Sequence, residues 1–161
     1  MNQTNQTSKS HPTTVSQLES HLGFWLRFVS NHVSAGFKKL VEENGVSVSE
    51  WVALRYLFDS EASSALELID ALGMTKGAVS KVVTRLESKR LVKRIVLEND
   101  KRAQQIALTA AGRRLVPQLA ALADQNDAHF FGHMTKQQQT SLFNMMRQIT
   151  KIHGLKHLPV D

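Results

Sequence analysis

The sequence predicts a mainly α-helical chain with one small β-hairpin, an α+β fold. Two observations lead to this fold class: helix-start signals recur along the chain, and between residues 91 and 108 the apolar residues change from a helical to a strand-like period. The 161 residues, 42% of them hydrophobic, suffice for one compact domain or for one domain with a helical extension. The chain has no cysteine, which excludes disulfides, thiolate metal sites and cysteine nucleophiles.

Six serine or threonine residues stand where a helix N-cap is expected. Four of them begin a capping box, in which the hydroxyl and the side chain of a Glu or Gln three residues later satisfy two free N–H groups. The other two are simpler caps. The boxes are Ser16-x-x-Glu19, Ser47-x-x-Glu50, Ser64-x-x-Glu67 and Thr135-x-x-Gln138, and the simpler caps are Thr75 and Thr109. We therefore expect helices at about 17–43, 48–59, 65–72, 76–89, 110–131 and 136–152.

Apolar periodicity supports these helices. The first carries a stripe that steps by three and four residues, as a packed helix face does, formed by Leu22, Leu26, Val29, Val33, Phe37 and Leu40. Pro117 is expected to kink the fifth helix. Residues 91–97 and 104–108 have strand character, and the polar turn Glu98-Asn99-Asp100-Lys101 between them predicts the hairpin.

Positive charge is concentrated in one segment. The whole chain has a formal net charge of +6, and residues 75–102 alone hold nine Lys and Arg against three acids, which is also +6. A local basic surface favours a polyanion such as nucleic acid, although a solvated charged face is the plain alternative.

The segment 65–109 has the order of a winged helix-turn-helix: a short helix, the turn Leu72-Gly73-Met74-Thr75, an amphipathic helix and a β-hairpin. The outer face of the second helix presents small residues, hydroxyls and cations without an acid, which suits the DNA major groove better than an ordinary surface helix. The DNA-contacting residues predicted on this helix are Lys76, Gly77, Ser80, Lys81, Thr84 and Arg85.

These residues resemble the MarR family (multiple-antibiotic-resistance regulators). The resemblance rests on the segment from Leu66 to Thr75, on the helix from Gly77 to Glu87, and on a wing formed by Leu91-Val-Lys-Arg94 and Asp100-Lys-Arg102-Ala103, followed by Leu108-Thr-Ala-Ala-Gly112. It covers residues 16–152. One departure is Arg90, at a position where the family usually has glycine; either the turn is rebuilt or the extra cation contacts a phosphate.

The resemblance implies a homodimer that binds a pseudo-palindromic operator in double-stranded DNA. It makes Arg102 a minor-groove probe at the wing and Asp100 its supporting acid. The implied organisation is a disordered tail at 1–15, a dimerisation region at 16–46 and 110–155, and a winged helix-turn-helix at 47–109. The expected function is a transcriptional regulator, a repressor released by a small aromatic or anionic ligand.

Two further sets of residues are candidates for ligand sites. An effector pocket could be lined by Trp25, Phe28, His32, Trp51 and Arg55, which core packing explains equally well. His129 and His133 have the spacing of a metal-binding pair on one helix face, but a solvated or interface pair is favoured, so no metal or other cofactor is expected.

Two alternatives remain open at this point: a zinc-responsive regulator, and a helical protein-interaction module that has lost DNA binding. No phosphate loop, nucleophile elbow or zinc-protease motif is present, so an enzyme is not expected. The sequence contains neither a bilayer-spanning apolar run nor a secretory signal, and we expect a soluble, cytoplasmic protein.

Overall fold

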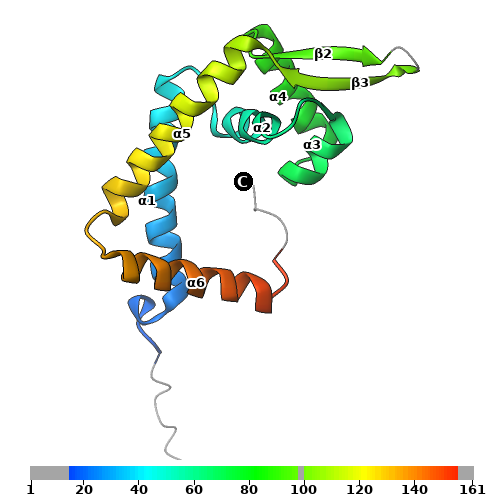
Figure 1. Ribbon diagram of the computed structural model, residues 1–161. Helices are drawn as coiled ribbons and strands as arrows, with labels where there is room; N and C mark the ends of the chain where they lie inside the picture. The colour runs from blue at the N-terminus through cyan, green and yellow to red at the C-terminus, as the bar shows by residue number, and fades with distance from the viewer. Residues whose placement is uncertain (1–14, 98–99, 156–161) are drawn as a thin grey trace, which may run out of the picture. The chain divides into compact units, whose positions relative to one another are not determined.

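The computed structural model describes residues 15–97 and 100–155, with the side chains of Leu97 and of residues 100–103 left out. The chain forms two compact units, Met1–His32 and Val33–Asp161. Helix α1 (Leu22–Glu43) continues through the boundary between them (Figure 1). None of the helices in the described part of the chain is long and apolar enough to cross a membrane.

The first unit begins differently from the prediction. A short 3-10 helix, η1 (Leu18–Ser20), precedes α1, and Ser16 does not cap a helix. Its hydroxyl lies 3.0 Å from Nε2 of His21, while Ser20 donates its hydroxyl hydrogen to the carbonyl of Gln17. These local bonds close a tight turn and delay the start of α1 to Leu22.

The predicted apolar stripe of α1 is buried only in part. Val33, Phe37 and Leu40 are half-buried, whereas Leu22 and Val29 are exposed. Within this single chain the stripe is therefore packed only in the second half of the helix, and packing of the first half stays a prediction.

Five helices of the second unit start and end close to the predicted positions: α2 (Val48–Phe58), α3 (Ala65–Leu72), α4 (Lys76–Ser88), α5 (Ala110–Phe131) and α6 (Lys136–Ile152). The capping boxes at Ser47, Ser64 and Thr135 are formed, and Thr75 and Thr109 cap α4 and α5 as predicted. Pro117 lies inside α5, which continues as one helix.

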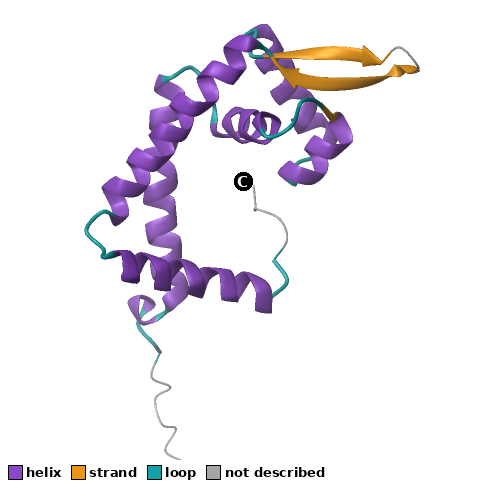
Figure 2. Ribbon diagram, viewed as in Figure 1, coloured by secondary structure: helices purple, strands orange, loops and turns teal. Residues whose placement is uncertain are grey.

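The predicted hairpin is present as β2 (Val92–Leu97) and β3 (Asp100–Leu108), which run antiparallel and extend away from the helices (Figures 1 and 2). A third strand, β1 (Ser63–Ser64), joins the other edge of β3, so the strand order is β1-β3-β2. The sequence did not predict β1 because two serines carry no strand signal of their own. Strand β3 also begins earlier than the predicted residue 104.

The core of the second unit lies among α2, α3, α4, α5 and the sheet. Its most completely buried side chains are Leu54, Leu57, Leu68, Leu86 and Leu119. Helix α5 starts directly against the turn that follows α4, because Gly112 leaves room for the carbonyl of Leu91: a Cβ there would lie 2.2 Å from that oxygen. Thr109 donates its hydroxyl to the carbonyl of Arg90 at 2.7 Å, which fixes the same junction.

Candidate nucleic-acid interface

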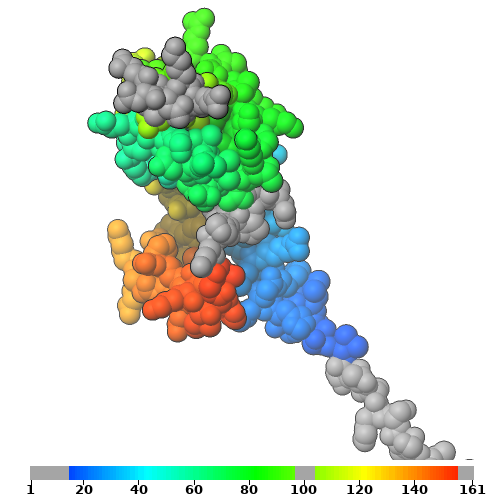
Figure 3. All heavy atoms as spheres, turned by 90° about the vertical axis from the view of Figure 1, so that its right-hand side faces the viewer, coloured from blue at the N-terminus to red at the C-terminus, as the bar shows by residue number. Residues whose placement is uncertain are grey.

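Helices α3 and α4 form a helix-turn-helix whose turn is set by two residues. Gly73 ends α3 in the left-handed conformation, with φ 62°, which glycine adopts without steric cost. Two residues later Thr75 begins α4, and its hydroxyl accepts a hydrogen bond from the N–H of Ala78 at 3.3 Å. The side chains of α3 and α4 form much of the surface that faces the viewer in Figure 3.

Helix α4 has one buried and one exposed face, as predicted. The buried side chains are Val79, Val82, Val83 and Leu86, which hold the helix on the core. The six residues proposed from sequence for DNA contact are all exposed: Lys76, Gly77, Ser80, Lys81, Thr84 and Arg85. Apart from its two chain neighbours and the helix's own nearby backbone, no described atom lies within 4 Å of a Cβ built on Gly77, so the first turn of the helix is open to a close approach.

The cations of this face are not neutralised by described neighbours. Lys76, Lys81 and Arg85 form no salt bridge with a described side chain. The acid on α4, Glu87, is paired instead with Arg94 of β2, with Nε 3.1 Å from the carboxylate. The exposed face of α4 therefore keeps its positive charge.

Arg94 was placed in the wing by the resemblance, but its contacts with α4 were not predicted. Besides Glu87, its guanidinium approaches the hydroxyl of Thr84 at 3.4 Å and the side-chain oxygen of Gln104 at 3.5 Å. These contacts brace the hairpin against α4. The bond to Thr84 leaves the hydroxyl hydrogen of that residue available as a donor.

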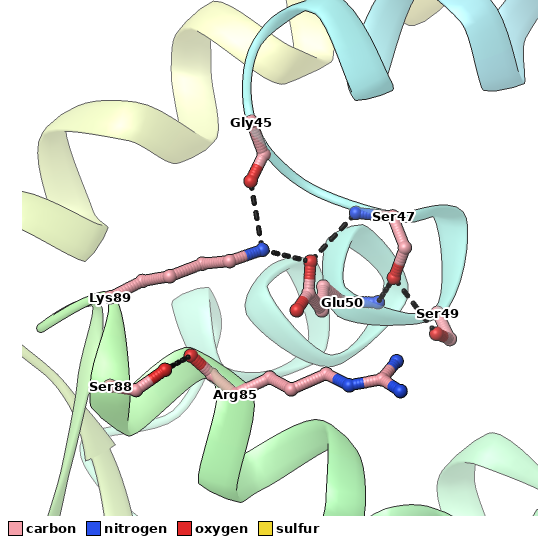
Figure 4. Close-up of polar contacts among 7 residues, drawn as sticks. All are labelled: Gly45, Ser47, Ser49, Glu50, Arg85, Ser88 and Lys89. Carbon is pink, nitrogen blue, oxygen red and sulfur yellow. Dashed lines mark hydrogen bonds and ion pairs between the residues drawn. The ribbon is translucent and has the colours of Figure 1, made fainter.

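The C-terminal end of α4 is fixed to α2 by a second ion pair (Figure 4). Lys89 Nζ lies 2.7 Å from the carboxylate of Glu50, which is 2% exposed, and 2.8 Å from the carbonyl of Gly45. The same carboxylate accepts the N–H of Ser47 at 2.7 Å and so completes the capping box of α2. The sequence analysis had recognised Glu50 only as a capping residue.

Arg90 forms a left-handed turn at the position where the resemblance leads one to expect glycine. Its φ is 58°, in the left-handed region. The N–H of Arg90 donates to the carbonyl of Glu87, and that of Leu91 to the carbonyl of Leu86, each at 2.9 Å. This is the Schellman arrangement that ends a helix. The turn is therefore not rebuilt, and the arginine adopts a strained conformation.

The two residues predicted at the wing are Asp100 and Arg102. Their backbone belongs to β3, and their side chains lie outside the part of the chain that the structure describes. Their roles stay predictions.

The residues suggested for an effector pocket divide between the two units. In the first unit, Phe28 and His32 pack with ring centroids 4.4 Å apart, next to Trp25. In the second unit, Trp51 and Arg55 line a pocket of about 340 Å³ together with Tyr56, Ala71 and Leu72. The guanidinium of Arg55 is already 2.7 Å from the carboxylate of Asp59, so an anionic ligand would have to compete with that acid.

His129 and His133 are not both on a helix. Helix α5 ends at Phe131, and His133 lies beyond it. No group of three or more potential metal-ligating side chains was found in the described part of the chain.

Comparison with known proteins agrees with this geometry. Residues 44–103 match the model described as the MarR family. The HTH-type transcriptional repressor Rv2887 of Mycobacterium tuberculosis is 27% identical over 131 residues, which are 81% of this chain and 94% of the repressor.

Two solved structures have the same fold. One is BpsR of Bordetella bronchiseptica, studied for the regulation of its DNA binding by 6-hydroxynicotinic acid (TM-score 0.72, 22% identity, 84% of this chain and 97% of that one). The other is a MarR C80S mutant from E. coli in complex with operator DNA (TM-score 0.70, 20% identity, 80% and 92%). The matched segment contains α2, α3, α4 and most of the hairpin, the elements that build the exposed basic face, and over this segment the chain is similar to the MarR family.

Proposed function

We propose that this protein is a transcriptional regulator that binds double-stranded DNA sequence-specifically, with α4 in the major groove. The observation that carries the proposal is the exposed face of α4, on which cations and hydroxyls stand without a free acid. A helix of about 10–12 Å diameter fits the major groove of B-DNA, which is about 12 Å wide. The open backbone at Gly77 allows close approach at the first turn.

Each residue of this face has a distinct role in the proposal. Lys81 and Arg85 lie one turn apart, and as long cations they can reach guanine O6 and N7 or a phosphate. Ser80 and Thr84 are short donors, and Lys76 at the first position of the helix favours a phosphate near the positive end of the helix dipole. Arg102 is proposed to enter an adjacent narrow minor groove from the hairpin, with Asp100 orienting it.

The protein is proposed to act as a homodimer. Helix α6 leaves several large apolar side chains exposed on one face within the single chain, among them Met145 (55%), Met146 (43%) and Ile149 (46%). Such a stripe is unusual on a monomer surface. In the proposed organisation residues 16–46 and 110–155 form the dimer, and residues 47–109 bind DNA. A two-fold dimer requires a pseudo-palindromic operator.

Repression and its release by a small ligand are the finer part of the proposal. Support comes from the repressor and the ligand-regulated relative named above, and from the pocket beside Trp51 and Arg55, whose size and mixed apolar and polar lining suit a small aromatic molecule. We also infer that the protein works in the cytoplasm, in the compartment of the DNA that it binds.

The proposal is tested by equilibrium binding to a duplex that the wild-type protein enriches from a random pool. Lys81→Ala and Arg85→Ala should weaken binding while thermal unfolding stays nearly unchanged, because both side chains are exposed. If the replaced side chain reads a base, the variant should lose about 1–3 kcal/mol of binding free energy and discriminate less at one base position. If the side chain contacts a phosphate, the slope of log affinity against log salt concentration should become smaller by about one. Lys39→Ala, on the exposed side of α1, is the charge-matched control, and because Lys39 lies in the proposed dimerisation region, sedimentation first establishes that this variant keeps the wild-type oligomeric state. Unchanged binding of both α4 variants would rule out α4 as the reading element.

A further inference from the structure

The contact between Glu50 and Lys89 joins three parts of the second unit. Lys89 is the residue at which α4 ends, Glu50 lies in the first turn of α2, and Gly45 belongs to the turn that ends α1 (Figure 4). Residues 89 and 50 are 39 positions apart in sequence. The ammonium group lies between a carboxylate oxygen at 2.7 Å and a carbonyl oxygen at 2.8 Å.

The pair is placed where it affects the direction of α4. The proposed DNA contacts follow the exposed face of α4 from Lys76 to Arg85, and the end of the helix just beyond them is held by Lys89 and by the Schellman turn at Arg90. A change at that end alters the direction of the helix and so displaces the side chains on its exposed face. Base reading depends on side chains reaching fixed positions in the groove, whereas attraction to the phosphate backbone tolerates displacement.

Glu50 itself cannot contact DNA. Its side chain is 2% exposed and accepts bonds from Lys89 and Ser47. A buried carboxylate that lacks its cation destabilises the folded protein, so Glu50 and Lys89 remain paired in the folded state.

We propose that the Glu50–Lys89 ion pair is a positioning contact for sequence-specific DNA binding, which holds α4 at the angle required for base reading by tying its end to α2 and to the turn after α1. The inference rests on the proposed function. Neither side chain reads a base.

The test compares two duplexes of equal length: the one enriched by the wild-type protein and a generic one without the enriched sequence. The variants are Lys89→Met, Glu50→Gln, the double variant and Lys89→Arg. The matched loss of one exposed lysine is Lys39→Met, used once sedimentation has shown that it keeps the wild-type oligomeric state. Urea denaturation of each variant, at the protein concentration used for binding, establishes the folded fraction.

Lys89→Met should bind the enriched duplex at least about fivefold more weakly, the equivalent of one lost base contact. Its binding to the generic duplex should change no more than that of Lys39→Met. Glu50→Gln gives the sharper result, since it makes the protein more positive and simple electrostatics predicts tighter binding to both duplexes. The positioning role predicts weaker binding to the enriched duplex instead.

The double variant should lose little more than either single variant, because both remove the same contact. Lys89→Arg, which keeps a cation next to the carboxylate, should lie closer to the wild type than to Lys89→Met. Hydrogen exchange of the free protein should also become faster in the last turn of α4 and the first turn of α2 together. If Glu50→Gln fails to fold, the comparison of Lys89→Met with Lys89→Arg still tests the positioning role of the ion pair.

Three results overturn the inference. The first is wild-type affinity for the enriched duplex in both single variants. The second is an equal loss for Lys89→Met on both duplexes with a salt slope lowered by about one, which marks a phosphate contact. The third is a loss of binding to the enriched duplex that is fully accounted for by the unfolded fraction of the variant in the denaturation experiment. These results differ from a failure of the proposed function itself, in which the wild-type protein would enrich no duplex from the random pool.

Discussion

Replacing Arg90 by glycine should stabilise the protein. Arg90 has φ 58°, a conformation that costs a side-chain-bearing residue roughly 1–2 kcal/mol and costs glycine nothing. The backbone bonds of the turn, from Arg90 to Glu87 and from Leu91 to Leu86, do not depend on the side chain. Against this gain stands the greater freedom of glycine in the unfolded chain, about 0.4–1 kcal/mol. The net expectation is a gain of about 0.5–1 kcal/mol.

The assay is urea denaturation at fixed protein concentration, together with a thermal melt. For a chain of this size about 1 kcal/mol corresponds to roughly 2–4 °C in Tm. The matched control is Gly73→Ala, because Gly73 occupies the same conformation, with φ 62°, at the end of α3. This change should lower the free energy of unfolding by about 1 kcal/mol. An Arg90→Gly protein no more stable than the wild type would refute the idea that this turn is strained.

Further predictions concern other parts of the chain. Gly112→Ala should cost about 1–3 kcal/mol of unfolding free energy, because its Cβ would press on the carbonyl of Leu91; a melt within error of the wild type would contradict the close approach. Asp100→Ala should weaken binding to the enriched duplex although it removes a negative charge, and tighter binding would refute the orienting role. Met146→Lys, on the exposed apolar face of α6, should shift sedimentation from about twice the 18.0 kDa chain mass toward the monomer, whereas an unchanged dimer would place the interface elsewhere.

Local chemistry made much of the fold predictable. The Ser47, Ser64 and Thr135 boxes each lie within four consecutive residues, so hydroxyl and carboxylate or amide find the free N–H groups regardless of the rest of the fold. Ser16 has the same pattern and failed, because neighbouring side chains close a 3-10 turn there instead. The outer face of α4 was predictable because four buried residues at helical spacing leave the opposite side exposed.

Contacts between distant residues were not predictable. Glu50 and Lys89 meet only because α2 and α4 pack together, and nothing in either segment indicates the partner. The same applies to β1, which exists only as an edge partner of β3. Arg94 lies in the hairpin strand β2, but its side chain contacts Glu87 and Thr84 of α4. Packing across the core therefore determined which charges stay exposed on the candidate interface.

The most direct test of the central claim is selection of bound duplexes from a random pool by the wild-type protein, followed by sequencing. A dimer that reads the major groove with α4 should enrich one pseudo-palindrome whose half-sites are centred about one helical turn apart, 10–10.5 base pairs. Each α4 side chain that reads a base should appear as a preferred base at equivalent positions of both half-sites, whereas phosphate contacts give no preference. Enrichment of no sequence, or of a single site without two-fold symmetry, would contradict the account.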